Sequence, residues 1–500
     1  MNIAHILARG AVMAEGAPAI GVGTRALYSY PALIDRVRQL AGGMGERGIG
    51  PGDRVALYLN NCAEYLEIEL ATWWLGAAVV PINAKLTHSE LEVIVREAEP
   101  KLLFAHNEIP ELTDGLTTIV PASPAYEGLL AAAAAPATPM PVAPNDLAWL
   151  FFTSGTTGVP KGAMIGHGAI WSMIQGYLTD IDEVPAGAAV LHLAPLSHGS
   201  GMYALVFLAC GGTCVVPADP KFDPATVRNL IAHWPEACFF AAPTMVRRLV
   251  ADLKAAGGPI PQPRTIIYGG GPLYLGDLLQ AADLLGPVFA QFYGQGECPM
   301  TITAQSRRAF SAALAAGDTH YLRTVGRAFL GTEIKIAGTT GAQLPTGAIG
   351  EIMVRSDTLC TGYWRNAQAT EATFGGGWLR TGDLGRLDDT GLLTLEGRSK
   401  EVIITGGSNV YPIEVEAVLL RHDAVSEAAV LGVPHPDWGE TVVACIAAPG
   451  ADATTLEAEL DALCRHHIAR FKCPKRYVVL NELPKNAYGK IAKRELAAEL

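Results

Sequence analysis

The densest group of chemically useful side chains lies about a third of the way along the chain, where hydroxyls, glycines and one lysine stand together. The run is Thr153, Ser154, Gly155, Thr156, Thr157, Gly158, Val159, Pro160, Lys161 and Gly162. Its glycines let backbone N–H groups converge, its hydroxyls can donate and its lysine adds charge, which together suit phosphate oxygens. It is not a Walker loop, which needs Gly-Lys-Ser/Thr, because Pro160 precedes Lys161 and Gly162 follows it. The alternative is a solvated turn, and the length and order of the run argue against it.

Four further segments follow in order, namely Tyr293-Gly294-Gln295-Gly296-Glu297, Arg380-Thr381-Gly382-Asp383, Gly397-Arg398-Ser399-Lys400 and Pro484-Lys485-Asn486-Ala487-Tyr488-Gly489-Lys490. With the hydroxyl-rich loop they resemble the motifs of the adenylate-forming superfamily of acyl- and aryl-CoA synthetases, luciferases and peptide-synthetase adenylation domains. The resemblance covers nearly the whole chain. It implies an α/β fold with a large N-terminal domain of several subdomains and parallel sheets, residues 1–399. A small α+β C-terminal lid domain, residues 400–500, would carry the catalytic lysine.

Each of these residues also makes chemical sense by itself. The Tyr293 ring offers a stacking face for adenine, and Glu297 can hold Mg²⁺ that bridges phosphate oxygens. The Asp383 carboxylate can accept hydrogen bonds from both ribose hydroxyls, and Arg398 can donate to the ribose. Taken singly, the simpler interpretations would prevail: a core tyrosine, a surface ion pair and a turn aspartate.

The resemblance implies roles for further residues of this sequence. It implies that Lys490, with His198 and Glu297, is catalytic, that Lys400 is the hinge, and that His198 is a gate between the carboxylate pocket and the thiol channel. The implied ATP- and AMP-binding residues are Thr153, Ser154, Gly155, Thr156, Thr157, Lys161, Gly270, Tyr293, Gly294, Asp383 and Arg398. The implied acyl pocket contains His198, Gly199, Gly201, Gly269 and Gly271, the CoA-binding residues are Gly406, Gly407 and Trp438, and the metal ligands are Glu297 and Thr156.

One position departs from the family pattern. Relatives usually have threonine before the glutamate, and this chain has Gly296. The change removes a hydroxyl donor to the α-phosphate, so Thr156 or Thr157 is expected to contribute more. Restoring threonine at position 296 is expected to leave activity intact or to raise it.

The favoured function is an ATP-dependent carboxylic acid–CoA ligase, with ATP, Mg²⁺ and coenzyme A as its requirements. Two other classes stay open: an adenylating enzyme that loads a carrier protein, and a nucleotide-binding protein without catalysis. The segment Ser197–Ser200 lacks the aspartate of amino-acid-activating members, which argues against the first of these classes. Both Lys490 and Glu297 are present, which argues against the second.

The class of the substrate acid is inferred from residues 184–218, a long stretch that contains no charged residue. Such a stretch suggests buried strands and a helix around an apolar acyl pocket, so the acid is expected to be an aliphatic (fatty) or aromatic monocarboxylate. Arg247 and Arg248 could reach a second carboxylate, although a solvated helix face is the simpler interpretation.

Composition limits the class of protein further. The 500 residues suffice for about three structural units. The net charge of −12 leaves no basic excess for nucleic acid. Nine scattered cysteines form no zinc pattern and favour reduced thiols in a cytoplasmic protein. No signal peptide is expected, because Met1–Gly10 lacks a basic start followed by an apolar run and a small-residue cleavage site. No transmembrane helix is expected, because prolines interrupt the uncharged stretch. A homodimer is considered as its assembly.

These groups must be positioned by alternating strands and helices. Strands are predicted at residues 54–59, 78–82, 101–105 and 147–153, and helices from Ser29 onward and at 62–75, 89–98 and 167–177. Such alternation predicts parallel sheets covered by helices. The C-terminal region is predicted to mix strands at 402–404, 428–432, 441–447 and 477–480 with helices at 413–420 and 456–467. Residues 121–144, rich in Pro and Ala, are interpreted as a surface linker, and residues 21–26 as a hairpin turn.

Overall fold

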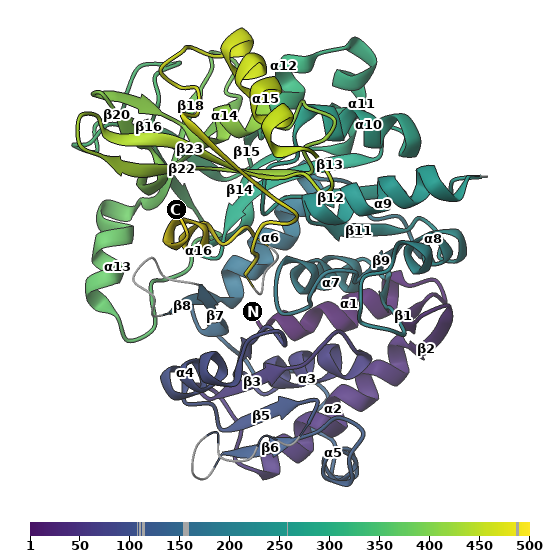
Figure 1. Cartoon of the computed structure of the whole chain (residues 1–500). Helices are drawn as coiled ribbons and strands as arrows, with labels where there is room; N and C mark the ends of the chain where they lie inside the picture. The colour runs from purple at the N-terminus through teal and green to yellow at the C-terminus, as the bar shows by residue number, and fades with distance from the viewer. Residues whose placement is uncertain (108, 110–111, 113–115, 154–159, 258, 487–489) are drawn as a thin grey trace. The chain divides into compact units, whose positions relative to one another are not determined.

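The computed structural model of the chain consists of two compact units, which are described separately (Figure 1). Unit 1 comprises Met1–Ile334 and Val354–Leu379, and unit 2 comprises Lys335–Met353 and Arg380–Leu500. The structure describes residues 1–500 except 108, 110–111, 113–115, 154–159, 258 and 487–489. Both units combine helices with sheets, which confirms the predicted α/β class, while the division after residue 399 stays a prediction.

One sheet of unit 1 carries the hydroxyl-rich loop. Its order is β6-β5-β3-β4-β7-β8, and its neighbours are parallel except for β7 and β8. The strands are β3 (Arg54–Tyr58), β4 (Ala78–Pro81), β5 (Leu102–Ala105), β6 (Thr117–Ile119), β7 (Leu147–Thr153) and β8 (Lys161–Gly166). The helices of this region are α2 (Tyr30–Glu46), α3 (Ala63–Trp74), α4 (His88–Ala98) and α5 (Pro124–Leu130). The predicted alternation is confirmed, and it places Thr153 at the end of β7 and Lys161 at the start of β8.

A second sheet of unit 1 carries the segment that contains Glu297. Its order is β15-β14-β13-β12-β11-β9-β10-β1-β2. The strands are β1 (Pro18–Val22), β2 (Arg25–Ser29), β9 (Ala189–Leu191), β10 (Thr213–Val216), β11 (Cys238–Ala241), β12 (Thr265–Tyr268), β13 (Phe289–Gln295), β14 (Cys298–Gln305) and β15 (Arg327–Ala328). The helices are α1 (Ile6–Met13), α6 (His167–Asp180), α7 (Gly199–Ala209), α8 (Pro224–His233), α9 (Pro243–Ala256), α10 (Leu275–Leu285), α11 (Arg307–Ala316) and α12 (Thr319–Arg323). Strands β1 and β2 pair antiparallel, which confirms the hairpin predicted at residues 21–26.

The uncharged stretch at residues 184–218 forms part of the core of unit 1. It supplies β9, α7 and β10, and residues 200–209 of α7 are all buried. This confirms the prediction of buried strands and a helix. Within the described ranges, no helix has both the length and the apolar character needed to cross a membrane.

The prediction of a surface linker over residues 121–144 is wrong in its first half, which contains helix α5. Ser123 caps this helix by accepting a hydrogen bond from the Tyr126 N–H, with Pro124 in the first turn. The backbone then packs closely on α2, because a Cβ on Gly43 would lie 2.3 Å from the Leu129 carbonyl oxygen. A serine followed by proline is a helix-start signal, and the Pro- and Ala-rich composition around it obscured that signal.

The remaining strands form two sheets, one in the order β16-β17-β18-β19 and one in the order β21-β20-β23-β22 with β24 beside β23. They are β16 (Thr332–Ala337), β17 (Gly350–Ser356), β18 (Leu379–Leu387), β19 (Leu393–Arg398), β20 (Ile403–Thr405), β21 (Ser408–Val410), β22 (Glu427–His435), β23 (Gly439–Ala447) and β24 (Arg476–Leu480).

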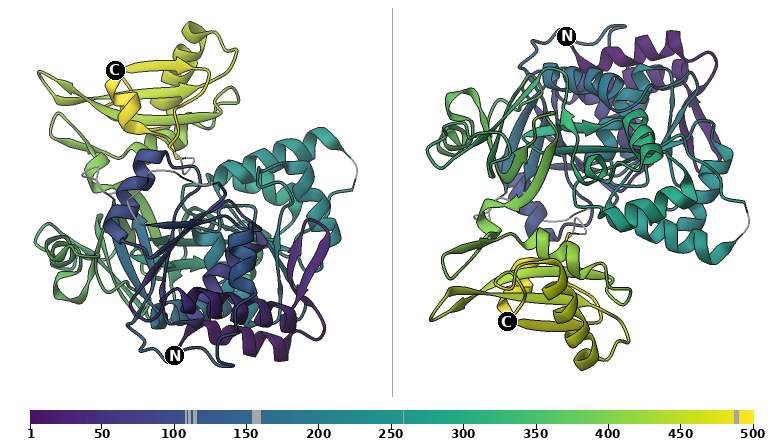
Figure 2. Two further views of the ribbon diagram at one scale, coloured as in Figure 1. Left: turned by 90° about the horizontal axis from the view of Figure 1, so that it is seen from below. Right: turned by 90° about the horizontal axis from the view of Figure 1, so that it is seen from above.

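The second of these sheets lies in unit 2 and has helices on both faces (Figure 2). The helices are α14 (Pro412–Leu419), α15 (Ala453–His467) and α16 (Lys493–Ala498). Successive strand residues point to opposite faces. Val430 and Ala444 therefore pack with α14 and α15, whereas Ala429 and Cys445 pack with α16. The predicted mixture of strands and helices in the C-terminal region is confirmed.

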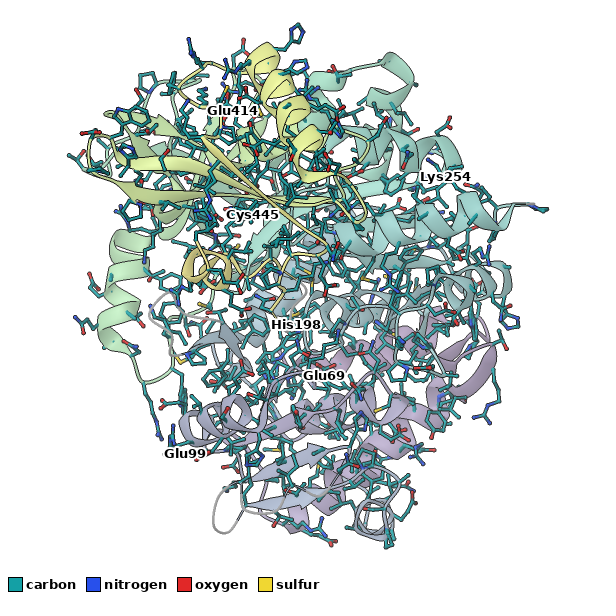
Figure 3. The ribbon with its side chains drawn as sticks, in the orientation of Figure 1. Glu69, Glu99, His198, Lys254, Glu414 and Cys445 are labelled. Carbon is teal, nitrogen blue, oxygen red and sulfur yellow. The ribbon has the colours of Figure 1, made fainter. Side chains whose placement is uncertain are left out.

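Two glutamates on α3 are fully buried but differ in their partners. Glu67 accepts hydrogen bonds from the Arg36 guanidinium at 2.9 and 3.0 Å and from the Tyr126 hydroxyl at 2.9 Å. Glu69, in the interior of unit 1 (Figure 3), has no hydrogen-bond partner for either oxygen among the described residues. Burial raises the pKa of Glu69 well above its ordinary value, so folding favours the protonated, neutral form of this carboxyl group.

Glu69→Gln is expected to stabilise the protein, and to do so more at pH 8 than at pH 5. In the unfolded chain this carboxyl ionises near its ordinary pKa of about 4.3, whereas in the folded protein burial raises that pKa. Stability therefore falls as the pH rises above about 4.3, by up to about 1.4 kcal/mol per pH unit, and glutamine removes that loss. Denaturant unfolding at the two pH values measures the effect.

The matched control is Glu67→Gln on the same helix. It is expected to destabilise the protein by about 3 kcal/mol at pH 8, because it leaves the partly buried Arg36 guanidinium without its counter-charge. Equal effects of the two substitutions would contradict the difference in charge state inferred here.

Candidate active site

The structure divides the predicted site residues between the two units. Unit 1 contains Thr153, Lys161, His198, Gly199, Gly201, Gly269, Gly270, Gly271, Tyr293, Gly294 and Glu297, and unit 2 contains Asp383, Arg398, Lys400, Gly406, Gly407, Trp438 and Lys490. Ser154, Gly155, Thr156 and Thr157 lie outside the described residues. The roles of these four, including Thr156 as a metal ligand, stay predictions.

Glu297 lies at the tip of the hairpin formed by β13 and β14, where the strand pairing leaves Gly296 and Glu297 as a two-residue turn. Two hydroxyls donate to one oxygen of its carboxylate, Oε1. The Tyr363 hydroxyl is 2.8 Å away and Thr153 Oγ1 is 3.4 Å away. The structure thus brings together Thr153 and Glu297, which are 144 positions apart in the sequence.

Tyr363 reaches this turn on a short segment that pairs with the edge strand β8. Ala163 and Tyr363 form an antiparallel bridge, with backbone hydrogen bonds on either side of it. Lys161, the first residue of β8, lies over the Tyr363 ring with Nζ 5.1 Å from the ring centre. One tyrosine therefore contacts both the lysine of the hydroxyl-rich loop and the glutamate of the turn.

Sequence analysis did not identify Tyr363. It lies in the uncharged run Thr361-Gly362-Tyr363-Trp364, where an aromatic ring is usually a packing residue, and its only signal was the glycine beside it. Burial and the nearby Glu297 carboxylate raise the pKa of the Tyr363 phenol, so it keeps its proton and acts as a donor.

The Glu297 carboxylate has the chemistry of a magnesium ligand. Mg²⁺ prefers one or two carboxylates together with water and phosphate oxygens. Because both hydroxyls engage Oε1, Oε2 is the oxygen that they leave for another ligand. The turn therefore fits a cation that is shared with a nucleotide.

His198 precedes the first turn of α7, near the centre of the view in Figure 3. Its Nδ1 lies 2.9 Å from Ser197 Oγ, and its ring meets Phe151 edge-on with ring centres 5.4 Å apart. A Cβ on Gly199 would lie 2.9 Å from Met300 Sδ, and Met300 has a left-handed backbone with φ of 61°. Residues held in such a conformation are concentrated at functional sites.

Three of the predicted site glycines have a structural requirement of their own. A Cβ on Gly201 would lie 2.0 Å from the Leu196 carbonyl oxygen, and one on Gly269 would lie 2.8 Å from the Phe292 ring. Gly270 has φ of 76°, which favours glycine. Packing and backbone geometry thus account for these glycines, and their part in an acyl or nucleotide pocket stays a prediction.

In unit 2, Asp383 and Arg398 face each other across the adjacent strands β18 and β19. Arg398 Nε lies 2.9 Å from Asp383 Oδ1. Lys490 lies within electrostatic reach of both side chains. The structure therefore groups these three residues, and Lys400 follows Arg398 in the short helix Ser399–Glu401, its hinge role still a prediction.

The residues predicted to bind CoA also lie together in unit 2. Gly406 and Gly407 form the turn between β20 and β21, with φ of 55° and 79°, which suits glycine at both positions. The Gly406 N–H donates to the Trp438 carbonyl at 2.9 Å. Trp438 is 46% exposed as a residue, and its ring stacks on His435, with ring centres 4.7 Å apart.

A groove of about 640 Å³ opens beside Trp438. Its charged lining consists of Arg465, Arg470, Lys475, Glu457 and Asp461. Arg465 pairs with Asp461 at 2.7 Å. The groove therefore combines an exposed indole with several cations, which is a suitable surface for a phosphorylated nucleotide.

Family models match both parts of the chain. The model of the AMP-binding enzyme matches residues 7–364, and the model of the AMP-binding enzyme C-terminal domain matches residues 414–490. The chain belongs to the AMP-binding enzymes. This confirms the resemblance to the adenylate-forming superfamily that the ordered motifs indicate.

Individual relatives narrow the branch of the AMP-binding enzymes. A feruloyl-CoA synthase from an Amycolatopsis species is 34% identical over 98% of this chain and 97% of its own. A medium/long-chain-fatty-acid–CoA ligase from Mycobacterium tuberculosis is 31% identical over 93% of this chain and 84% of its own. The structure of o-succinylbenzoate CoA synthetase from Bacillus subtilis, with its acyl-adenylate intermediate, matches with a TM-score of 0.86 at 28% identity, covering 98% of this chain and 97% of that one. The predicted fold and CoA synthetase branch are confirmed.

The structure explains why this AMP-binding enzyme has Gly296 where relatives usually have threonine. A Cβ at position 296 would lie 2.5 Å from Thr153 Cγ2 and 2.8 Å from the Phe151 ring. Thr153 and Phe151 of β7 together fill the space that a threonine side chain needs. The expectation that restoring threonine preserves or raises activity is revised accordingly.

Gly296→Thr is now expected to slow acyl-adenylate formation at least about tenfold, because the overpacked side chain displaces Thr153 and the Glu297 turn. Phe151→Leu relieves the contact with the ring and leaves that with Thr153, so the double variant should recover part of the lost rate. Pyrophosphate release without CoA, measured for the parent, both single variants and the double variant, gives the coupling between the two positions. Full activity of Gly296→Thr alone would contradict the packing argument.

Proposed function

We propose that this AMP-binding enzyme is an ATP-dependent carboxylic acid–CoA ligase. The first step joins the acid to AMP and releases pyrophosphate, and the second transfers the acyl group to the thiol of CoA. The observation that carries the proposal is the meeting of Lys161 and Glu297 on the Tyr363 side chain, beside the end of β7. Because Tyr363 is neutral, the charges of Lys161 and Glu297 remain available for a charged ligand.

In the first step, an oxygen of the substrate carboxylate attacks the α-phosphorus of ATP, and the bond to pyrophosphate breaks. Negative charge spreads over the phosphate oxygens, so the protein must supply positive charge and alignment. We assign Lys161 and Lys490 to the phosphates, Tyr293 to adenine, and Asp383 with Arg398 to the ribose. Glu297 would hold Mg²⁺, which when bound neutralises phosphate charge.

In the second step, the CoA thiol attacks the carbonyl carbon of the acyl adenylate and AMP leaves. The two steps need different surroundings at one carbon, so we propose a rotation of the C-terminal domain about Lys400 between them. His198, beside Phe151 at the start of α7, is assigned as the gate between the carboxylate pocket and the thiol channel.

The groove beside Trp438 favours CoA over a carrier protein as the acceptor. CoA carries an adenine and three phosphates, which match an exposed indole and the cations Arg470 and Lys475. The feruloyl and fatty-acid relatives, both named as CoA enzymes, support the same choice.

We propose that the acid is an aromatic or aliphatic monocarboxylate. The buried α7 supports an apolar acyl site. The two arginines considered for a second carboxylate already have partners: Arg247 Nη1 lies 3.7 Å from Asp277 Oδ2, and Arg248 lies over the Phe222 ring at 4.9 Å. The feruloyl-CoA synthase and the fatty-acid–CoA ligase among the relatives represent the two subclasses.

A panel of acids tests this proposal most directly. Hydroxycinnamic, benzoic, medium-chain and long-chain acids, with dicarboxylic acids as the control, are assayed for pyrophosphate release and for loss of free CoA thiol. Pyrophosphate release without thiol loss would point to a carrier protein, and turnover of the dicarboxylic acids alone would contradict the monocarboxylate assignment.

A cytoplasmic location and a homodimer complete the proposal. The first is supported by the cysteines: all nine are free, and only Cys62 and Cys210 are less than fully buried. Light scattering of the purified protein tests the second.

Lys490→Ala is expected to lower adenylate formation by at least about 10²-fold, because its ammonium group neutralises the charge that forms at the phosphate. It should spare thioester formation when the acyl adenylate is supplied ready-made. Single-turnover measurement of each half-reaction checks this. Equal loss in both would indicate a general defect and remove the specific assignment.

Trp438→Ala is expected to raise the apparent KM for CoA about tenfold, since base–aromatic stacking contributes about 1–3 kcal/mol. The KM for ATP and the rate of pyrophosphate release without CoA should not change. Trp438→Phe keeps a stacking face and should retain most of the affinity. A CoA KM that is the same in all three proteins would exclude Trp438 from the CoA site.

A further inference from the structure

Tyr363 contacts two groups of opposite charge that are distant in the sequence. Its hydroxyl donates to Glu297 Oε1 at 2.8 Å, and the face of its ring lies 5.1 Å from Lys161 Nζ. The side chain is almost fully buried, with the whole residue 7% exposed. Any displacement of this ring therefore changes the surroundings of both charges.

The backbone holds Tyr363 against both elements at once. On one side, the Trp364 N–H donates to the Gly162 carbonyl at 2.7 Å, next to Lys161. On the other side, the Cys360 N–H donates to the Glu297 carbonyl at 2.9 Å. The segment 360–364 thus connects the strand that starts with Lys161 to the turn that carries Glu297.

Both ends of this segment are fixed by further contacts. Before it, the Thr358 hydroxyl accepts a hydrogen bond from the Thr301 hydroxyl of β14 at 2.6 Å. After it, Arg365 pairs with Glu99 of the α4 C-terminus through two contacts of 2.7 Å. Together with the backbone hydrogen bonds of Cys360 and Trp364, these contacts hold Tyr363 in place from different elements of the fold.

We propose that Tyr363 is a positioning residue for Mg²⁺-ATP, because it orients the Glu297 carboxylate and holds Lys161 without neutralising it. The torsion that turns a glutamate carboxylate is broad, and a hydrogen bond to Oε1 fixes it so that Oε2 is presented to the cation. A carboxylate beside Lys161 would compete with phosphate, whereas a ring face attracts the ammonium group and leaves its N–H donors for the nucleotide. The inference rests on the metal role proposed for Glu297.

Tyr363→Phe tests the hydroxyl alone, because it keeps the ring that contacts Lys161. The probe is Mn²⁺, observed by electron paramagnetic resonance, titrated into the full-length protein saturated with α,β-methylene-ATP, which cannot release pyrophosphate. We expect the Mn²⁺ affinity to fall about 10-fold or more, as for other residues that orient a metal ligand. Calorimetric binding of the same analogue without metal should be unchanged.

Tyr126→Phe is the matched control, since it also removes a buried hydroxyl that donates to a glutamate, here Glu67 at 2.9 Å. It should leave Mn²⁺ affinity unchanged. Tyr363→Leu removes the ring as well, and it should in addition weaken metal-free binding of the analogue several-fold. Thermal unfolding verifies that each variant is folded.

The outcomes separate this inference from the proposal beneath it. Glu297→Gln with native Mn²⁺ affinity would remove the metal role of Glu297 and the inference with it. Loss of affinity in Glu297→Gln but not in Tyr363→Phe would overturn only the positioning role. Metal-free binding that is the same in Tyr363→Leu and the parent would overturn the part that concerns Lys161.

Discussion

Glu297 lies on a two-residue turn between β13 and β14. Such a short turn does little to fix the orientation of the carboxylate. Its orientation depends on the neighbouring elements: β7 provides the Thr153 hydroxyl and the segment beside β8 provides the Tyr363 hydroxyl. The pairing of that segment with β8 also sets the ring beneath Lys161. The unit 1 part of the candidate site therefore exists only when the two sheets of this unit are correctly placed.

The sequence predicted the elements well where the signals are local. Strand β7 has the predicted bounds, and α2 starts at Tyr30, directly after Ser29, whose side chain caps the helix as expected. Hydrophobic periodicity and helix caps depend on residues that are close in the sequence, so they can be recognised without a structure. Tyr363 was not predicted, because its importance comes from contacts with residues that are distant in the sequence. Glu297 is 66 positions away, and Lys161 lies on strand β8.

Gly296 is a second case in which contacts distant in the sequence decide the role of a residue. The motif shows glycine where threonine is usual, and from the sequence alone this was interpreted as the loss of a hydroxyl donor. In the structure, Phe151 and Thr153 occupy the space in question, so glycine at 296 and a large ring at 151 are complementary in volume. Interiors are packed too densely to accept one change without the other. A departure from a family motif can thus be compensated on a strand that the motif does not include.

Charged side chains of unit 1 differ in the kind of partner that they meet. A charge with a structural role meets an opposite charge: Arg36 pairs with Glu67, which is fully buried. The two charges assigned to ATP meet neutral groups instead, Glu297 two hydroxyls and Lys161 a ring. An ion pair between them would satisfy both without any ligand and would have to break before a phosphate could bind. Because Tyr363 stands between the two and neutralises neither, their charge remains available for the nucleotide, and a mainly structural role would not require this separation.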